Sequence, residues 1–458
     1  MAILKENAIY RVTIDGYASD GAGVARIDGQ VLFVKGGVRT ELCDVLLEKV
    51  GKSACWGRVV KIISACPARQ NPDCLHYSTC GGCQFRHMNY AEELEAKRLR
   101  VEEALHRLGG LSLDVSVIHG AKNTQRYRNK VQFPVAPGEG NDPRIGFFRA
   151  KSHTVVDVAD CLLQPDSAGR IRAAVKVWMT QNNVPAYEER TGKGLVRHLF
   201  LRTNARGESL CCLVANGKSL PHEEELVAAL RAAEPQLLGI ILNENTRDTN
   251  VVLGRSFRTL WGQDFLEDTL KGLTFRLSVP SFYQVNRDQT EVLYGIAADF
   301  AALTGGETLL DLYCGIGTIG LTLAGKAKKV IGAEIIPQAV EDARENAARN
   351  GITNAEFLCG DASVVAAKLA EDGVKPHVIT VDPPRKGLAP EVISAMVQMA
   401  PERIVYVSCD PATLARDLKL FAGQGYTAVK AEAVDLFPRT AHVETVTLLL
   451  KSQNSHII

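Results

Sequence analysis

The sequence predicts a multidomain α/β protein with three parts: an N-terminal β-barrel, a central α+β domain and a C-terminal doubly wound sheet. The chain has 458 residues, which gives room for two to four domains. Residues 1–62 consist of short β-rich runs separated by Gly and Asp, with little helical periodicity. From about residue 280, strand-like and helix-like segments alternate, as in a parallel sheet that is covered by helices.

The composition is that of an ordinary globular protein, with 46% hydrophobic and 23% charged residues. A formal net charge of +1 means that any binding to nucleic acid has to use local basic patches. The N-terminus, MAILKENAIYRV, lacks the long apolar core of a signal peptide, and no apolar run approaches the length of a membrane span. We therefore expect a cytoplasmic protein without a membrane partner, and the sequence indicates no protein partner.

The first part, residues 1–62, is predicted to contain four or five strands, in runs such as GQVLFVKG and CWGRVVKII. A small barrel of OB type is a frequent shape among nucleic-acid-binding domains. A barrel with a purely structural role is the alternative interpretation.

The second part, residues 63–279, is predicted to hold helices at 90–108, near 168–181 and near 222–233, with strands dominating from about 112 onward. Between residues 121 and 151, seven Lys or Arg residues stand against two acids, and aromatic residues are interleaved with them. Basic groups bind phosphates and aromatic rings stack on unstacked bases, so this stretch predicts a surface for single-stranded RNA. The candidates are Lys122, Arg126, Tyr127, Arg128, Lys130, Phe133, Arg144, Phe147, Phe148, Arg149 and Lys151, with Arg197, His198 and Arg202 as a second group.

The chain has twelve cysteines and no export signal, which favours metal binding or catalysis over disulfides. The spacing Cys74-x5-Cys80-x2-Cys83, in a flexible loop, suits thiolate coordination of a metal, and a fourth ligand has to come from elsewhere. Cys66 and His76 are substitutes from the same loop. Six further cysteines lie among apolar or small residues and are predicted to fill the core: Cys43, Cys55, Cys211, Cys212, Cys314 and Cys359.

The third part, residues 280–458, begins with a glycine-rich strand-to-helix turn at residues 311–320, and Glu334 follows about twenty residues later. This pattern fits NAD as well as S-adenosylmethionine. Asp361 after the next strand and Asp382-Pro383-Pro384 after the fourth favour the methyl donor. Cys409 ends an apolar strand, where open α/β folds place their chemistry, and a thiolate there is a candidate nucleophile.

Five motifs in order resemble the RNA uracil-5-methyltransferase family. They are Gly21-Ala-Gly-Val-Ala-Arg26, Ser281-Phe-Tyr-Gln284-Val-Asn286, Asp382-Pro-Pro-Arg385, Ser408-Cys409-Asp410-Pro411 and His442-Val443-Glu444. The resemblance implies a TRAM barrel over residues 1–62, a central RNA-binding domain over 63–279 and a Rossmann-like class I methyltransferase domain over 280–458.

The resemblance also implies the chemistry. C5 of uracil becomes a nucleophile once a thiolate has added to C6, and Cys409 is the thiol that the family match assigns to this addition. Glu444 is the base that it assigns to removal of the C5 proton. The positions implied to line the S-adenosylmethionine site are Gln284, Tyr313, Thr318, Glu334, Asp361 and Asp382.

Finally, the resemblance implies a [4Fe–4S] cluster held by Cys74, Cys80, Cys83 and Cys161, with zinc on the same ligands as the alternative. Cluster-bearing members with a TRAM domain point to 23S ribosomal RNA as the substrate, with transfer RNA as the alternative. Two interpretations from other classes stay open: an NAD-dependent oxidoreductase, supported by the glycine-rich turn, and a non-catalytic RNA-binding protein.

Overall fold

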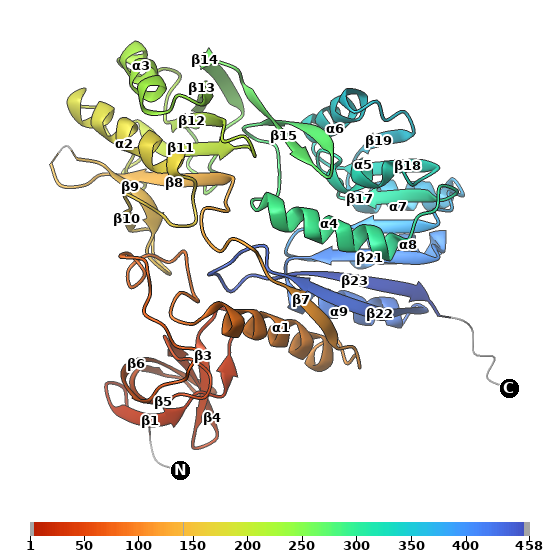
Figure 1. Ribbon diagram of the computed structural model, residues 1–458, viewed down its shortest axis with the longest axis horizontal. Coiled ribbons are helices and arrows are strands. Elements are labelled where there is room, and N and C mark those ends of the chain that lie inside the picture. Colours follow the sequence, from red (N-terminus) through yellow and green to blue (C-terminus); the bar gives the residue numbers. More distant parts are fainter. Residues whose placement is uncertain (1–3, 141, 453–458) are drawn as a thin grey trace.

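The computed structural model describes residues 4–140 and 142–452, and it has the expected three-part α/β architecture (Figure 1). The N-terminal part is one curled six-stranded sheet, in the order β1-β5-β6-β4-β3-β2, in which β1 also contacts β3. Its strands are β1 (Ile9–Thr13), β2 (Gly16–Tyr17), β3 (Gly23–Ile27), β4 (Gln30–Lys35), β5 (Leu42–Val50) and β6 (Ala54–Ser64). Alternating apolar residues fill the barrel, including Leu32, Val34, Val45 and Leu47.

The central part is a seven-stranded sheet in the order β10-β9-β8-β11-β12-β13-β14. Its strands are β8 (Lys130–Ala136), β9 (Arg144–Phe148), β10 (Val155–Asp157), β11 (Val196–Thr203), β12 (Ser209–Ala215), β13 (Leu237–Glu244) and β14 (Ser256–Gly262). Helices α2 (Asp166–Gln181) and α3 (Glu223–Ala233) pack on one face and bury a common apolar core with it. The hairpin of β15 (Phe265–Leu270) and β16 (Leu273–Ser278) leads to the C-terminal part.

The C-terminal part is an eight-stranded sheet in the order β19-β18-β17-β20-β21-β23-β22-β7. Its strands are β7 (Val115–His119), β17 (Thr308–Leu312), β18 (Lys329–Glu334), β19 (Ala355–Cys359), β20 (Val378–Val381), β21 (Arg403–Ser408), β22 (Tyr426–Val434) and β23 (Glu444–Lys451). Strands β17 to β21 are parallel, and β23 runs antiparallel to β21. All carboxyl ends of the parallel strands therefore meet at one edge, where β23 begins.

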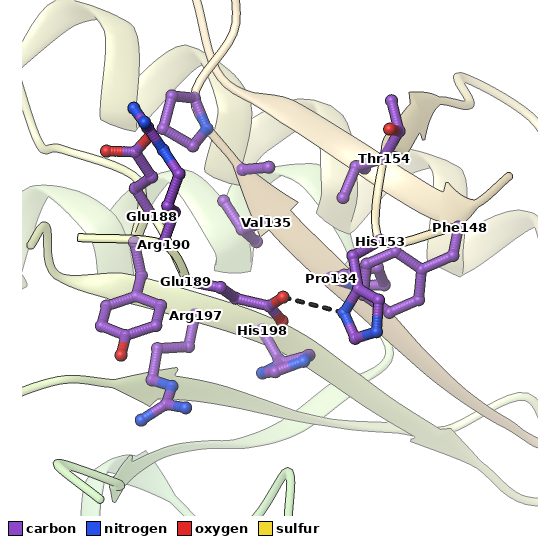
Figure 2. A pocket seen from close by; sticks show the side chains of 14 residues that line it. Pro134, Val135, Phe148, His153, Thr154, Glu188, Glu189, Arg190, Arg197 and His198 are labelled. Atoms are coloured by element: carbon purple, nitrogen blue, oxygen red, sulfur yellow. Dashed lines mark hydrogen bonds and ion pairs between the residues drawn. The ribbon is translucent and has the colours of Figure 1, made fainter. Parts of the chain in front are cut away.

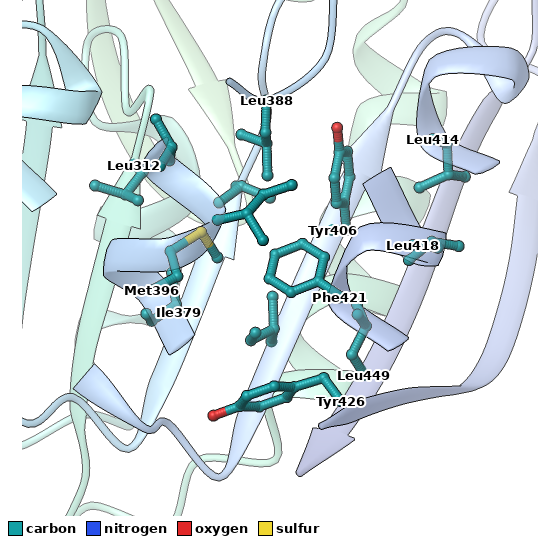
Figure 3. Close-up of a cluster of buried hydrophobic side chains, with 14 of the residues drawn as sticks. Leu312, Ile379, Leu388, Met396, Tyr406, Leu414, Leu418, Phe421, Tyr426 and Leu449 are labelled. Atoms are coloured by element: carbon teal, nitrogen blue, oxygen red, sulfur yellow. The ribbon is translucent and has the colours of Figure 1, made fainter. Parts of the chain in front are cut away.

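Helices cover both faces of this sheet, which makes it doubly wound. Helices α4 (Arg287–Ala301), α5 (Thr318–Ala324) and α6 (Pro337–Arg349) share one apolar core with the sheet. Helices α1 (Tyr90–Arg107), α7 (Ala362–Glu371), α8 (Pro390–Met399) and α9 (Pro411–Ala422) share the other. Figure 3 shows this second core, where Met396 lies beside Ile379 and Phe421 lies between Tyr406 and Leu449 of the sheet.

Helix α1 and strand β7 differ from the sequence-based division, which placed them in the central part. Strand β7 pairs in parallel with β22 at the edge of the C-terminal sheet, and α1 packs on α9. The reason is that β22 offers an open edge and α9 an apolar face, and neither partner is visible from the local pattern of residues 90–119. Among the described residues, no helix is both long and apolar enough to span a bilayer.

A buried ion network joins α1 to the segment that precedes β23. The Lys97 ammonium donates to Glu93 at 2.8 Å and to Asp435 at 2.6 Å, and all three side chains are fully buried. The Tyr90 hydroxyl donates to the other oxygen of Asp435 at 2.8 Å. The carbonyl of Arg439 accepts the backbone N–H groups of residues 84 and 85, which follow the cysteine-rich loop. We call residues 435–442 the pre-β23 loop; α1 holds it on one side and residues 84 and 85 hold it on another.

Replacing Lys97 with Met should destabilise the protein strongly, because it leaves the Glu93 and Asp435 carboxylates buried without a cation. We expect a loss of about 3–5 kcal/mol in the free energy of unfolding, measured by chemical denaturation. The matched control is Arg98→Met on the same helix, whose partners Glu95 and Glu102 are partly exposed, and it should cost less than about 1 kcal/mol. Equal losses for the two variants would contradict the role given to the network.

Candidate active site

A cavity of about 600 Å³ opens at the carboxyl ends of the parallel strands. Open α/β sheets bind their ligands at this edge, because the strand ends and helix N-termini present polar groups there. The cavity brings together all eight residues that the sequence singled out for catalysis and donor binding: Gln284, Tyr313, Thr318, Glu334, Asp361, Asp382, Cys409 and Glu444.

The glycine-rich turn after β17 is held in place by Asp311, a residue to which the sequence-based interpretation gave no role. One carboxylate oxygen accepts the N–H of Gly320 at 2.8 Å, and the other accepts the hydroxyl of Thr380 at 2.8 Å. Burial raises the pKa of Asp311 to about 6. Gly317 has a φ of +84°, a conformation that favours glycine and lets the backbone turn into α5. Asp311 thus shapes the turn that lines the cavity.

Two carboxylates mark the ends of the neighbouring strands β18 and β19. Glu334 accepts the N–H of Gly315 at 3.1 Å and the N–H of Ile336 at 2.8 Å, so its position against the turn is set by the backbone. Asp361 caps α7 and accepts the N–H of Ser363 at 2.9 Å; the hydrogen bonds from Ser363 lower the pKa of the Asp361 carboxyl.

Cys409 and Glu444 are brought side by side by the antiparallel pairing of β21 with β23. Ser408 pairs with Thr445, so the residue after β21 lies next to the first residue of β23. Burial, and then the carboxylates of Glu444 and Asp382, raise the pKa of the Cys409 thiol to about 11. Glu444 is 2% exposed, and its Oε2 has no hydrogen-bond partner among the described residues. The cavity therefore holds a thiol beside a carboxyl group with an unused oxygen.

Several acids share this cavity, and Arg385 offsets them. Burial raises the pKa of Glu444 well above its usual range, with Asp382 as the next cause, whereas the Arg385 guanidinium lowers it. Burial, and then the Asp311 carboxylate, raise the pKa of Asp382 to about 7. The pKa of His442, beside Arg385 at 3.4 Å, falls to about 4, mainly through burial. Arg385 and His442 belong to motifs that resemble the family, but the sequence assigned neither residue a role in setting the charge of this cavity.

The four predicted cluster ligands, Cys74, Cys80, Cys83 and Cys161, line a second, smaller cavity of about 130 Å³. The Arg86 Nε donates to the Cys83 sulfur at 3.4 Å. His76 also lines this cavity, whereas Cys66 is not among its lining residues. In the part of the chain that the structure describes, no group of three or more His, Cys, Asp or Glu side chains is arranged to hold a metal ion.

Some other predictions about single residues are wrong. Cys359 is exposed at the end of β19, whereas the other five cysteines assigned to the core are buried. Phe133 is a core residue of the central domain, and Arg202 is 1% exposed and donates to the carbonyl of Ser281 at 2.6 Å. Arg126 pairs with Asp160 at 2.7 Å but stays partly exposed, so its predicted place on the surface is not contradicted. Local charge and aromatic content do not reveal which face of a strand a residue occupies.

The parallel sheet, the glycine-rich turn and the acids that follow successive strands define a class I methyltransferase fold. Residues 89–452 match the family described as tRNA (Uracil-5-)-methyltransferase, and residues 4–61 match the TRAM domain. The chain therefore belongs to the tRNA (uracil-5-)-methyltransferase family and carries an N-terminal TRAM domain.

Similar proteins agree with this assignment. An "uncharacterized RNA methyltransferase" of Clostridium tetani is 43% identical over 447 residues, which cover 97% of both chains. One of Caldanaerobacter subterraneus is 43% identical over 442 residues, covering 96% of this chain and 97% of the other. The structure resembles the Pyrococcus abyssi tRNA (uracil-54, C5)-methyltransferase in complex with S-adenosyl-L-homocysteine, with a TM-score of 0.76, 26% identity and coverage of 96% of this chain and 100% of that one.

The raised pKa of Asp382 predicts a pH-dependent stability effect. A carboxyl whose pKa is raised on folding stabilises the native state below pH 4, and this contribution is lost as the pH rises through about 7. Asp382→Asn should therefore raise the free energy of unfolding at pH 8 by about 1–2 kcal/mol and change it little at pH 4.5. Thermal unfolding at both pH values measures this. Asp299→Asn, on the exposed side of α4, is the control and should show no such dependence; a pH-independent effect of Asp382→Asn would contradict the assignment.

Proposed function

We propose that the protein transfers a methyl group from S-adenosylmethionine to C5 of a uridine in RNA, with Cys409 as nucleophile and Glu444 as base. The observation that carries this proposal is the adjacency of the Cys409 thiol and the Glu444 carboxyl in the cavity that also holds the donor-side residues. RNA is the substrate class of the family and suits the TRAM domain.

The proposed methyl transfer takes three steps. The Cys409 thiolate adds to C6, and the electron pair of the C5–C6 double bond makes C5 nucleophilic. C5 attacks the sulfonium methyl, so a C–C bond forms, the S–CH₃ bond breaks and S-adenosylhomocysteine leaves. Glu444 then takes the C5 proton; the electron pair restores the double bond and expels the Cys409 thiolate. Burial raises the pKa of Cys409 to about 11, so its thiol must release a proton to solvent or to a neighbouring base before it adds to C6. Burial also raises the pKa of Glu444, which makes the Glu444 carboxylate a stronger acceptor for the C5 proton.

The proposed donor site uses the strand ends on the other side of the cavity. Glu334, fixed by two backbone N–H groups, has the position that in this fold accepts the hydroxyls of an adenosine ribose. Asp361, at the N-terminus of α7, is suited to the adenine edge. Gln284, Tyr313, Thr318 and Asp382 line the space between this end and Cys409. The transferred methyl group would then lie between donor and uracil.

For the RNA target we propose 23S ribosomal RNA first, on the TRAM domain and the cysteine set. Transfer RNA is a second candidate with an observation of its own. The Pyrococcus abyssi tRNA enzyme resembles this chain over 96% of its length, which includes most of the N-terminal barrel, so the barrel by itself does not distinguish the two RNA targets. To identify the target, the protein is incubated with labelled S-adenosylmethionine and with each RNA from a strain that lacks the gene. Nucleoside analysis then shows which RNA carries labelled 5-methyluridine. If neither RNA gains 5-methyluridine, the proposal is wrong. NAD-dependent turnover would favour an oxidoreductase, and RNA binding without methylation would favour a non-catalytic RNA-binding protein.

The proposed nucleophile and base give opposite expectations. Cys409→Ala should abolish methylation because no C6 adduct forms. Glu444→Gln should methylate once and keep a covalent protein–RNA adduct, since the C5 proton stays and the thiolate is not expelled. A shifted band on a denaturing gel detects the adduct. Cys359→Ala is the control thiol because it is exposed on the same domain, and it should methylate normally. Methylation by Cys409→Ala would refute the mechanism.

We further propose that Cys74, Cys80, Cys83 and Cys161 hold a [4Fe–4S] cluster, with zinc as the alternative. Four thiols, the donors that such a cluster takes, come from two distant segments and line one cavity, and Arg86 donates toward the Cys83 sulfur, although their present arrangement is not that of a metal site. When bound, the cluster would tie residues 74–83 to residue 161. The methyl transfer needs no electrons from it.

Cys161→Ser should lower the bound iron and sulfide strongly after anaerobic purification, because it removes the only ligand from the second segment. Cys66→Ser is the matched control and should keep the metal content of the unaltered protein. Elemental analysis and the visible absorption spectrum measure this. A colourless protein with stoichiometric zinc would exclude the cluster, and loss of metal in Cys66→Ser would correct the ligand set.

A further inference from the structure

A separate cavity of about 500 Å³ lies in the central domain, where β8, β9 and β11 meet the loop of residues 185–193 (Figure 2). The rings of Phe148 and His153, with centroids 5.5 Å apart, lie on one side. Tyr187 and Arg197 line the other, and the Arg197 guanidinium stacks on the Tyr187 ring at 4.3 Å. The cavity thus offers flat side chains for stacking, and its size suits a nucleoside.

This cavity lies on the face of the central sheet that leads to the catalytic site. Leu199 and Leu201 pack against α2 and α3, so the alternation of β11 puts His198 and Arg202 on the opposite face. His198 lines the cavity, and Arg202 donates to Ser281, in the segment that runs into the catalytic site. His198 and Arg202 are four positions apart along β11, or about 13 Å, a distance that a short stretch of single-stranded RNA can span.

Strand β8 also runs from the catalytic cavity to the cavity of the central domain. Lys130, at its start, lies 5.9 Å from the ring of Phe282, which is 63% exposed and lines the catalytic cavity. Pro134, four residues further, pairs with His198 and lines the second cavity. Gln132 lies exposed between them. A strand of RNA whose target base enters the catalytic cavity can follow β8 to the second one.

The charge of the cavity favours an uncharged ligand over a phosphate. Glu188 and Glu189 balance Arg190 and Arg197. Burial, and then the charge of Arg197, lower the pKa of His198 to about 4, which keeps its ring neutral. The Nδ1 of His198 and the Nε of Arg197 are buried without a hydrogen-bond partner among the described residues. The edge of a base provides donors and acceptors, and these two atoms meet it only after their side chains turn, because neither atom is exposed to the cavity.

We propose that this cavity, which we call the base pocket, receives one unstacked base that flanks the target uridine in the RNA. The proposal rests on the proposed methylation of RNA and adds a second point at which the RNA is read. A base that leaves its stack to enter the pocket exchanges stacking on RNA neighbours for stacking on protein rings. The base pocket then sets the distance along the RNA between the target and a second unpaired nucleotide.

The test pairs changes in the protein with changes in the RNA. The protein variant is His153→Ala/His198→Ala, and the RNA is a fluorescein-labelled fragment that the protein methylates, with single abasic positions on either side of the target. We expect one abasic position to weaken binding about tenfold, and the variant to weaken binding of the intact RNA by a similar factor. Combining the double variant with that abasic RNA should weaken binding no more than either change alone, because both changes remove the same contact. KM for RNA should rise while kcat at saturating RNA stays unchanged.

The control is His222→Asn, a histidine on the α2–α3 side of the same domain, which should bind RNA normally. Stabilisation by S-adenosylhomocysteine in thermal unfolding should equal that of the unaltered protein, which separates lost RNA contact from lost folding. If the double variant is unfolded, His153→Ala replaces it, because that side chain is 74% exposed.

If no RNA is methylated, the proposed function fails, and a labelled single-stranded RNA of mixed sequence still tests the base pocket by binding. Unchanged affinity of the variants for RNA, or losses that multiply with every abasic position, would overturn the base pocket.

Discussion

The buried ion network around Lys97 is the constraint on which the arrangement of this protein depends. A buried ammonium is tolerated only when carboxylates satisfy it in a defined geometry, and here one carboxylate comes from α1 and the other from the pre-β23 loop. That loop leads directly into Glu444. It also accepts hydrogen bonds from residues 84 and 85, next to Cys83. The cysteine-rich loop, α1 and the carboxyl group of the catalytic cavity are therefore parts of one connected assembly.

The catalytic cavity is held in a state that costs stability. Asp311, Asp382 and Glu444 are carboxyl groups with raised pKa values that share one region, and Arg385 offsets them only in part. Selection for stability alone would replace these buried carboxyl groups by residues that cost less to bury. Groups that change protonation within reach of neutral pH are useful where a thiol must lose a proton and a carbon-bound proton must be accepted. The electrostatics thus agree with the chemistry proposed for the family.

Much of the fold could be predicted from the sequence, because periodicity and turn residues are local signals. The helix at 90–107 and the strand that ends before Cys409 are examples. The adjacency of Cys409 and Glu444 could not be derived from spacing, since it depends on the direction in which β23 runs beside β21. The pairing of β7 was missed because an edge strand takes whichever open edge the tertiary structure provides. The buried state of Arg202 was missed because its partner is a backbone carbonyl 79 residues away.

The placement of α1 and β7 has a consequence for how the chain is made. Lys97 and Asp435 are 338 residues apart, and β7 pairs with a strand that follows it by more than 300 residues. During synthesis the TRAM barrel and the central sheet emerge with all their strands before the C-terminal sheet is complete. Helix α1 carries one partner of Lys97, Glu93, but the second carboxylate, Asp435, is made only when the last tenth of the chain leaves the ribosome. Closure of the long-range ion network, and with it completion of the catalytic cavity, is then a late event in folding, and a truncated chain keeps its RNA-binding parts without an active site.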